Sequence, residues 1–239
     1  MNYFDHDRWR EAATHPDWYV RISDDYKRVT KLAEDKPDFA PAIKEEVRNF
    51  FEQLITDNVI PLGSPNPFLD SARQPIDTIV IHHTSAQPGY TLARMNVVHL
   101  LNVYAPYYAS PHVAGEEHLK GQAVASNHYQ NGQMVFYAYH WFVRMDGSAE
   151  RLLDDDQIGW HAGNWDINTR SVAICLDNNY ENAEPTPEVL RTVAKLLRDN
   201  YQQVNSNKII GHCEANPKTI CPGSTFLSNW KSILINLIA

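Results

Sequence analysis

The feature that most constrains the fold is a set of three short, β-branched apolar runs. They are "IDTIVIHHT" at residues 76–84, "SVAICLD" at 171–177 and "NKIIGH" at 207–212. Each run has the length and composition of a strand buried in a sheet. Segments with helical spacing of apolar residues lie between them. Strands that alternate with amphipathic helices predict an α/β fold, with a mixed β-sheet flanked by helices.

Helices and one hairpin are predicted around these strands. The helical segments are 91–104, 186–201 and 224–238. In the second of them, Thr186 is a suitable N-cap and Pro187 a suitable first residue. Residues 134–153 are predicted to form two strands joined at "MDGS", because Asp-Gly favours a hairpin turn. Residues 105–133 have weak periodicity and are interpreted as a long loop.

The first 65 residues are predicted to be a polar, helical extension. The clearest helix is "FAPAIKEEVRNFFEQLITDNV", where apolar side chains recur at spacings of three and four. Its single apolar stripe needs a covering surface, so we expect it to pack on the main domain. The stretch 61–70, rich in Pro, Gly, Ser and Asn, marks a boundary. We therefore expect an N-terminal helical extension at 1–65 and a larger domain at 66–239.

Charge, hydropathy and cysteine content exclude several classes of protein. A formal net charge of −8 argues against a nucleic-acid binder and against docking on an anionic membrane surface. No run of about 18 apolar residues is present that could span a membrane. The first residues lack the apolar core of a secretion signal, so we expect a protein that is cytoplasmic or released without a standard signal. Three cysteines are too few for a disulfide framework, although a Cys213–Cys221 bridge stays open.

Two of the predicted strands end in histidine. "IVIHH" ends at His82 and His83, "KIIGH" ends at His212, and Cys221 follows nine residues later. Two imidazoles and a thiolate would leave zinc a fourth position for water, the arrangement of a catalytic site. Neighbouring side chains of a strand face opposite ways, so only one of the first two histidines is expected to reach a metal. The alternative is that these histidines are structural and lie near a cysteine by chance, since the chain has 11 histidines.

Five segments together resemble the type 2 N-acetylmuramoyl-L-alanine amidases, a family that includes phage amidase-type lysozymes and animal peptidoglycan recognition proteins. In chain order they are "IVIHHT", "YHWFVRMDG", "GWHAGN", "NTRSVAICL" and "GHCEANPKTICPG". The resemblance covers about residues 75–239. It implies a mixed sheet flanked by helices. It also implies zinc-dependent hydrolysis of the amide between N-acetylmuramic acid and L-alanine in peptidoglycan or muropeptides.

The resemblance implies a role for particular residues of this chain. The Zn²⁺ ligands fall on His82, His212 and Cys221. The family tyrosine that lies near the zinc-bound water corresponds to Tyr139. The family donor to the oxyanion falls on Thr219 or Lys218, because the spacing between the last two ligands is one residue longer than in many members.

Further residues are candidates for contact with the substrate. They are His83, His140, Trp160, His161, Asn164 and Asn168. The competing interpretation of these residues is loop anchoring and core packing. For the whole chain, the alternative function is a peptidoglycan-binding module without hydrolysis. Family members of that kind typically lack the metal cysteine, which is present here. An unrelated metal hydrolase does not account for the ordered set of segments.

Overall fold

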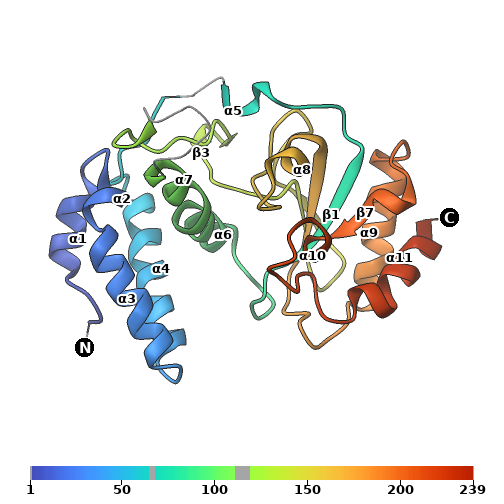
Figure 1. Cartoon of the computed structure of the whole chain (residues 1–239), viewed down its shortest axis with the longest axis horizontal. Coiled ribbons are helices and arrows are strands. Elements are labelled where there is room, and N and C mark those ends of the chain that lie inside the picture. Colours follow the sequence, from blue (N-terminus) through green and yellow to red (C-terminus); the bar gives the residue numbers. More distant parts are fainter. Residues whose placement is uncertain (1, 65–67, 111–118, 239) are drawn as a thin grey trace. The chain divides into compact units, whose positions relative to one another are not determined.

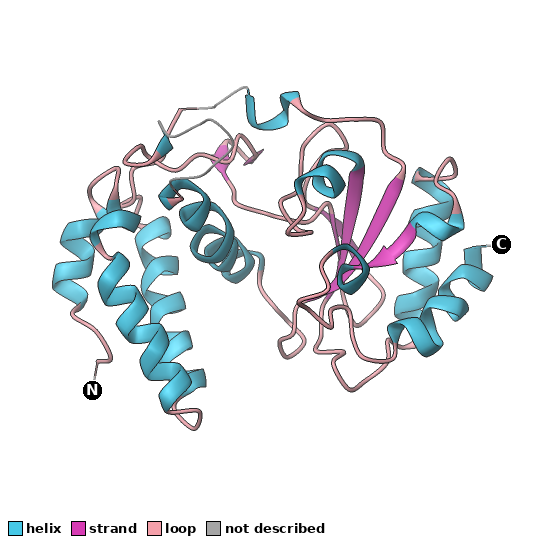
Figure 2. Cartoon of the chain, in the orientation of Figure 1, coloured by secondary structure: helices cyan, strands magenta, loops and turns pink. Residues whose placement is uncertain are grey.

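The structure, a computed structural model, describes residues 2–64, 68–110 and 119–238. It contains two compact units, each built from separate stretches of the chain. The first unit comprises residues 1–66 and 92–136, and the second comprises residues 67–91 and 137–239. Figure 1 labels the helices and strands, and Figure 2 shows the larger sheet within the second unit.

A five-stranded mixed sheet organises the second unit. Its strands are β1 (Thr78–His83), β4 (Trp141–Val143), β5 (Ala149–Arg151), β6 (Ser171–Leu176) and β7 (Ile209–Gly211). Their spatial order is β5-β4-β6-β1-β7. β1 pairs in parallel with β6 and β7, β4 pairs in parallel with β6, and β5 runs antiparallel to β4. The predicted mixed sheet is confirmed.

The inner strands β1 and β6 are mostly apolar because they are covered on both faces. All six residues of β1 and all six of β6 are buried, as expected for parallel strands inside an α/β fold. Helices α9 (Pro187–Asn200) and α11 (Lys231–Ile238) pack on each other beside the sheet (Figure 1). Their buried side chains join Ile79, Ile81 and Ile174 of the strands in one hydrophobic core.

The predicted start of α9 is confirmed. Thr186 Oγ1 accepts a hydrogen bond from the amide N–H of Val189 at 3.3 Å, and Pro187 is the first residue of the helix. Such a cap satisfies an amide that has no partner within the helix and is worth about 1 kcal/mol. The predicted closing helix is divided into a π-helical turn at Phe226–Trp230 and α11.

The hairpin predicted at "MDGS" is present, but its first strand is shorter than expected. The turn contains Gly147 at φ +83°, a conformation that favours glycine. β4 begins only at Trp141. Just before it, Nδ1 of His140 accepts the amide N–H of Ala173 at 3.1 Å. A side chain therefore replaces a main-chain acceptor there, which ends the regular ladder.

Helices make up most of the first unit. They are α1 (His6–Ala13), α2 (Trp18–Arg21), α3 (Ser23–Asp35), α4 (Ala40–Thr56), α6 (Leu92–His99), a π-helical turn (Leu100–Tyr104) and α7 (Ala105–Ala109). A small hairpin joins β2 (Tyr129–Gln130) to β3 (Gln133–Met134). The short helices α5 (Phe68–Ser71), α8 (Trp165–Arg170) and α10 (His212–Ala215) belong to the second unit. Among the described residues, no helix has both the length and the apolarity that crossing a membrane requires.

The apolar stripe of α4 is covered from within the first unit. Its buried side chains are Ile43, Val47, Phe51 and Leu54. The helix contacts α1, α3 and α6, and Arg94 of α6 forms ion pairs with Glu45 and Glu52 at 3.0 and 3.1 Å. The covering helix α6 thus comes from the stretch that the sequence assigns to the larger domain. As a statement about independent domains, the division at residue 65 stays a prediction.

The segment interpreted as a long loop, residues 105–133, is partly regular. It begins with α7 and ends within the β2–β3 hairpin, while residues 111–118 lie outside the described part. The hydroxyl of Tyr108 accepts the amide N–H of Ala125 at 3.1 Å and donates to the carbonyl of the same residue at 3.2 Å. Contacts of an aromatic side chain with the backbone therefore order a stretch that has no periodic pattern.

His99, at the end of α6, is a buried titratable residue. Burial lowers its pKa from 6.5 to about 4, against a smaller effect of a hydrogen bond to the Phe136 backbone. Between these two pH values the unfolded chain takes up a proton that the folded protein does not. The free energy of unfolding therefore decreases as the pH falls from 6.5 toward 4.

Replacing His99 with Gln removes this titration. Between pH 7 and pH 5 we expect the free energy of unfolding of the wild type to fall by about 2 kcal/mol more than that of H99Q. Other buried histidines titrate in both proteins, so the difference isolates this one residue. Urea unfolding of the two proteins at both pH values measures it, and an equal loss in both would contradict a neutral, buried His99.

Candidate metal centre

Two adjacent parallel strands bring His82 and His212 to the same edge of the sheet. His82 lies near the end of β1, and His212 follows directly after β7. The register pairs Ile81 with Gly211, so the next residue of each strand lies at that edge. Parallel strands present their carboxyl ends together, which is where α/β folds place their ligand sites.

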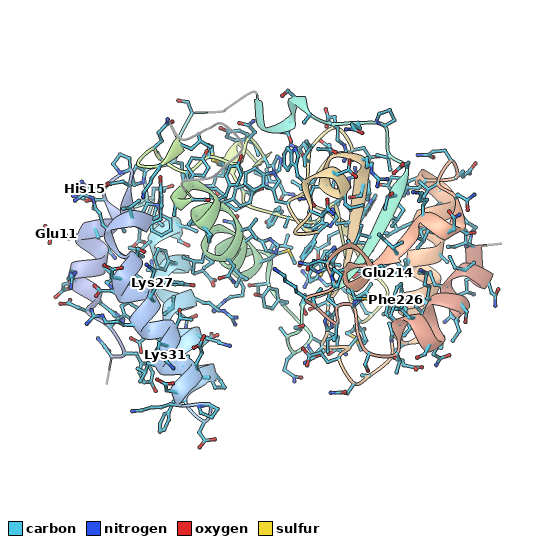
Figure 3. All side chains as sticks on the ribbon, viewed as in Figure 1. Glu11, His15, Lys27, Lys31, Glu214 and Phe226 are labelled. Atoms are coloured by element: carbon cyan, nitrogen blue, oxygen red, sulfur yellow. The ribbon has the colours of Figure 1, made fainter. Side chains whose placement is uncertain are left out.

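Close packing explains the glycine that precedes His212. A Cβ on Gly211 would lie 2.7 Å from the ring of Phe226. Helix α10 then begins at His212, and Glu214 Oε2 accepts the Gly211 amide N–H at 2.8 Å. Glu214 Oε1 pairs with Lys231 Nζ at 2.8 Å; Figure 3 labels Glu214 and Phe226 on this side of the second unit. These contacts determine where the backbone presents the His212 ring.

Cys221 lies in the loop that follows α10. The amide N–H of Cys213 donates to the carbonyl of Cys221 at 2.7 Å, which closes this loop. The Cys221 sulfur accepts the amide N–H of His83 at 3.4 Å and lies 3.8 Å from Nδ1 of His82. The backbone of β1 therefore positions the thiol beside the strand's own histidine.

His82, His212 and Cys221 form a compact cluster, which we call the HHC cluster. One potential ligand atom from each residue lies within 4.8 Å of the other two. The rings of the two histidines are 4.5 Å apart between centroids. His82 and Cys221 are buried and His212 is half-buried. The structure thus brings together the three residues that the sequence singles out as metal ligands.

The HHC cluster fits a zinc ion by its donor atoms. Two imidazoles and a thiol are ligands that zinc prefers, and three protein ligands leave one position open. Nε2 of His212 is buried without a hydrogen-bond partner, a state that costs roughly 1–3 kcal/mol and that a metal would relieve. Burial raises the pKa of the Cys221 thiol to about 12. A metal that binds here must therefore displace the thiol proton.

Cys213 lies beside the HHC cluster without joining it. All three cysteines are free thiols, so the structure does not contain the Cys213–Cys221 bridge that the sequence leaves open. Cys213 is half-buried and packs against the hydrophobic core of the second unit. This position indicates that Cys213 packs beside the cluster and is not a fourth ligand.

Tyr139 lies against the HHC cluster. Its ring centroid is 5.0 Å from that of His82, with the two planes at 42°. Burial, followed by the nearby Cys175 and Cys221, raises the pKa of the Tyr139 hydroxyl well above 10. Cys175, the residue paired with His82 in the neighbouring strand, shares a hydrogen bond with the tyrosine. The phenol therefore keeps its proton at neutral pH and can donate it in a hydrogen bond.

Thr219 and Lys218 differ in how firmly they are held. Thr219 Oγ1 accepts the amide N–H of Cys221 at 3.1 Å, and the residue is half-buried. The backbone amide of Lys218 donates to Asn216 Oδ1 at 3.1 Å, but the residue is exposed. Of the two candidate donors to an oxyanion, Thr219 has the more restricted side chain.

His161, from the "GWHAGN" loop, contacts the HHC cluster directly. Its Nδ1 lies 2.9 Å from Nε2 of His82, and its Nε2 lies 3.1 Å from Oγ of Ser171. Burial, followed by the nearby His212 and Arg73, lowers the pKa of His161 to about 3, so the ring is neutral. Because the residue is only 6% exposed and both ring nitrogens are engaged, the structure does not support the predicted substrate contact.

Asn168 and Asn164 shape the same loop in different ways. Asn168 is buried, and its Oδ1 accepts the amide N–H groups of His161 and Ala162 at 3.3 and 2.8 Å. It is therefore a loop anchor. Asn164 is exposed and caps α8 by accepting the amide N–H of Ile167 at 3.3 Å. Only the second of these predicted substrate contacts has a side chain that a substrate could reach.

Trp160 is buried and supports an exposed aromatic residue that the sequence interpretation missed. Its ring meets that of Trp165 edge-on, with centroids 6.2 Å apart and planes at 84°. Trp165 is 46% exposed and opens α8. Trp165 follows the "GWHAGN" segment directly, but no sequence pattern there indicates which of the two tryptophans is exposed.

His83 and His140, both predicted to contact substrate, are engaged inside the protein. His83 Nδ1 accepts the amide N–H of Tyr180 at 2.8 Å, and its Nε2 meets a serine hydroxyl at 2.9 Å. His140 is fully buried between the amide of Ala173 and a backbone carbonyl. Burial lowers the pKa of His83 to about 4 and that of His140 well below 6.5. These contacts use both nitrogens of each ring, which favours the competing interpretation of core packing.

Two further residues beside the HHC cluster gave no signal in the sequence. Ser171 meets His161, and Cys175 meets Tyr139. Both lie in β6, an apolar run in which neither residue stands out. The register of β6 on β1 places Cys175 opposite His82. Finding these residues from sequence requires the strand pairing, which periodicity does not provide.

Comparison with known proteins shows which family this chain matches. The family model described as N-acetylmuramoyl-L-alanine amidase matches residues 72–224. An endolysin of Klebsiella phage KP32 is 30% identical over 97 residues, which are 38% of this chain and 62% of the endolysin. The chain therefore spans less than two thirds of the length of that relative.

Solved structures that match this chain include an amidase and a recognition protein. N-acetylmuramoyl-L-alanine amidase LysC from Clostridium intestinale URNW is 20% identical, with a TM-score of 0.49 over 74% of this chain and 93% of that chain. The Drosophila peptidoglycan recognition protein SD is 21% identical, with a TM-score of 0.43 over 71% and 89% of the two chains.

The geometry of the HHC cluster predicts one tight zinc site. We expect the purified chain to bind one zinc ion and C221S to bind it at least 100-fold more weakly, because one of three ligands is lost. C213S is the matched control, since Cys213 packs beside the cluster, and it should bind zinc like the wild type. Competition with a chromogenic chelator measures the affinities. Equal zinc binding by C221S and C213S would remove Cys221 from the site.

Proposed function

This chain belongs to the N-acetylmuramoyl-L-alanine amidase family, and we propose that it is a zinc-dependent hydrolase of peptidoglycan or muropeptides. The bond that it would cut is the amide between N-acetylmuramic acid and L-alanine. The observation that carries the proposal is the convergence of His82, His212 and Cys221 within residues 72–224, the part that matches the family model. The proposed cofactor is Zn²⁺, and the proposed partner is cell-wall material.

His82, His212 and Cys221 would hold the zinc ion. In such a site zinc polarises the carbonyl of the substrate and lowers the pKa of a water molecule toward about 7. The protein contributes the buried surroundings of the zinc ion. His82 and Cys221 are buried, and charges interact more strongly there than at an exposed surface. A preorganised, partly dry site of this kind stabilises developing charge without having to reorganise.

Tyr139 would donate a hydrogen bond to water or substrate at the HHC cluster. Its hydroxyl keeps its proton because burial raises its pKa well above 10. Its ring lies against that of His82, with centroids 5.0 Å apart, which limits the directions that the hydroxyl can take. In this role Tyr139 orients the attacking oxygen rather than accepting its proton.

Thr219 is the better supported donor to the oxyanion of the tetrahedral intermediate. Its Oγ1 accepts the Cys221 amide N–H at 3.1 Å, which directs the hydroxyl hydrogen toward a different partner. A hydroxyl held in this way costs little to orient when negative charge develops. Lys218 is exposed, so its ammonium group would act through water and contribute less.

The surface beside the "GWHAGN" loop is the proposed contact with substrate. Asn164 is exposed at the start of α8, and its amide suits the hydroxyl and peptide groups of a muropeptide. Trp165, supported edge-on by Trp160, offers an exposed indole face. Aromatic side chains combine a large apolar area with a fixed orientation, which suits packing against a sugar ring.

A recognition module without hydrolysis is the alternative function. It would bind the same wall material through the same surface. Cys221 is a free thiol and Tyr139 lies beside the HHC cluster, and both favour the enzyme. Neither residue would be needed for binding alone.

The oxyanion role can be tested by three substitutions. T219V removes the hydroxyl while keeping the shape of the side chain, and we expect kcat to fall about 100-fold. T219S keeps the hydroxyl and should retain most of the activity. K218M should change kcat less than about 3-fold, because an exposed charge is screened. Rates of stem-peptide release, measured on variants with unchanged zinc affinity, decide between the two residues; a larger loss in K218M would reverse the assignment.

The reaction itself is tested by mass spectrometry of digests of purified peptidoglycan and of soluble muropeptides with zinc present. We expect free stem peptides that begin at L-alanine. They should be absent with C221S and present with C213S. If every digest contains only intact muropeptides while the protein sediments with the wall, the recognition module is the correct function.

A further inference from the structure

A series of hydrogen bonds begins on the side of the His82 ring that faces away from Cys221. Nδ1 of His82 lies 3.8 Å from the Cys221 sulfur, while Nε2 lies 2.9 Å from Nδ1 of His161. Nε2 of His161 in turn lies 3.1 Å from Oγ of Ser171. His82, His161 and Ser171 are all buried, so water does not compete for these hydrogen bonds.

The order of atoms along this series of hydrogen bonds restricts which ring nitrogen of each histidine carries the proton. For His82 to offer a lone pair at Nδ1, its proton must be on Nε2. That proton is then donated to Nδ1 of His161, which must accept. His161 in turn carries its proton on Nε2 and donates it to the hydroxyl oxygen of Ser171. In this order every hydrogen bond has one donor and one acceptor, and the serine hydroxyl accepts the last proton.

The His161 ring must be neutral for this arrangement, since a doubly protonated ring has no acceptor. The residue is 6% exposed, and its two ring nitrogens face an imidazole nitrogen and a hydroxyl rather than a carboxylate. Arg73 is fixed nearby, because its guanidinium donates to the carbonyl of Ser171 at 2.9 Å. These surroundings place Nδ1 of His161 opposite Nε2 of His82, where it can accept a hydrogen bond.

The backbone of the loop holds the His161 ring in place. Oδ1 of the buried Asn168 accepts the amide N–H of His161 at 3.3 Å and that of Ala162 at 2.8 Å. The next residue, Gly163, has φ +62°, and a Cβ there would lie 2.7 Å from Nδ2 of Asn216. The loop conformation is therefore fixed on both sides of the ring, and the direction of Nδ1 with it.

We infer that His161 is a positioning residue that holds His82 in the tautomer and orientation in which Nδ1 can bind a metal, with Ser171 as its own anchor. The inference rests on the proposed function, because it assumes that the HHC cluster binds zinc. It replaces the substrate contact predicted for His161 with a role inside the protein. Hydrogen-bond partners of metal-binding histidines typically change metal affinity 10- to 100-fold when they are lost.

Two substitutions of similar shape separate positioning from packing. In H161N the amide Oδ1 stands two bonds from Cβ, as Nδ1 does, so an acceptor for His82 is kept. H161L has nearly the same volume and no acceptor. We expect H161L to bind zinc 10- to 100-fold more weakly than the wild type, and H161N to bind within about 3-fold of it. Chelator competition measures the affinities, and the absorption spectrum of the Co²⁺ form reports whether the ligand geometry is preserved.

S171A provides a second test that leaves the His161 ring in place. Without the serine hydroxyl, Nε2 of His161 loses the partner that accepts its proton and anchors the ring, so zinc affinity should fall, by less than in H161L. Melting temperatures of the metal-free variants show whether each is folded. If H161L does not fold, the comparison of S171A and H161N with the wild type carries the test.

Each outcome either supports or overturns the inference. Weaker zinc binding by H161L and S171A, with near-normal binding by H161N, supports it. Wild-type affinity in H161L, or in S171A if H161L does not fold, overturns it. Equal weakening of H161N and H161L also overturns it, because that result indicates packing rather than an acceptor. A wild-type protein that binds no zinc contradicts the proposed function instead, so the two failures are distinguishable.

Discussion

The parallel pairing of β1 with β6 and β7 is the constraint on which the whole site depends. One neighbour places Cys175 opposite His82, and the other places His212 at the same sheet edge. Side chains of a strand alternate between faces, so a slip of one residue would exchange His82 for His83. The contacts of the two histidines oppose that slip, because His83 Nδ1 accepts the Tyr180 amide N–H while His82 lies between Cys221 and His161.

Burial has a second effect, on the charge around the HHC cluster. The pKa of His83 is lowered to about 4 and that of His161 to about 3, chiefly because both rings are desolvated. His140 is likewise kept neutral, with a pKa well below 6.5. Three imidazoles near the cluster therefore add no positive charge at neutral pH. A dication entering the site meets polar rings and a displaceable thiol proton instead of repulsion.

The sequence predicted what depends on local pattern. Strand positions and the Thr186 cap followed from β-branched runs and capping chemistry. Strand ends indicated a possible metal site, and the family resemblance selected His82, His212 and Cys221, which the structure brings together. The covering of α4 by α6 was not predicted, because periodicity identifies an apolar face but not its partner. The contact of His82 with His161 was missed for a related reason. It joins a strand to a loop 79 residues away, and only the folded loop brings the ring within 2.9 Å.

Because each of the two units is built from separate stretches of the chain, the protein is hard to divide into fragments. The polypeptide passes between them three times, after residues 66, 91 and 136. No single cut separates the helices from the sheet, and a chain that began after residue 66 would leave Arg94 without Glu45 and Glu52. The segment before residue 67 therefore supplies ion-pair partners to a helix that follows β1 in the chain. Neither unit can be produced as one continuous fragment of the chain.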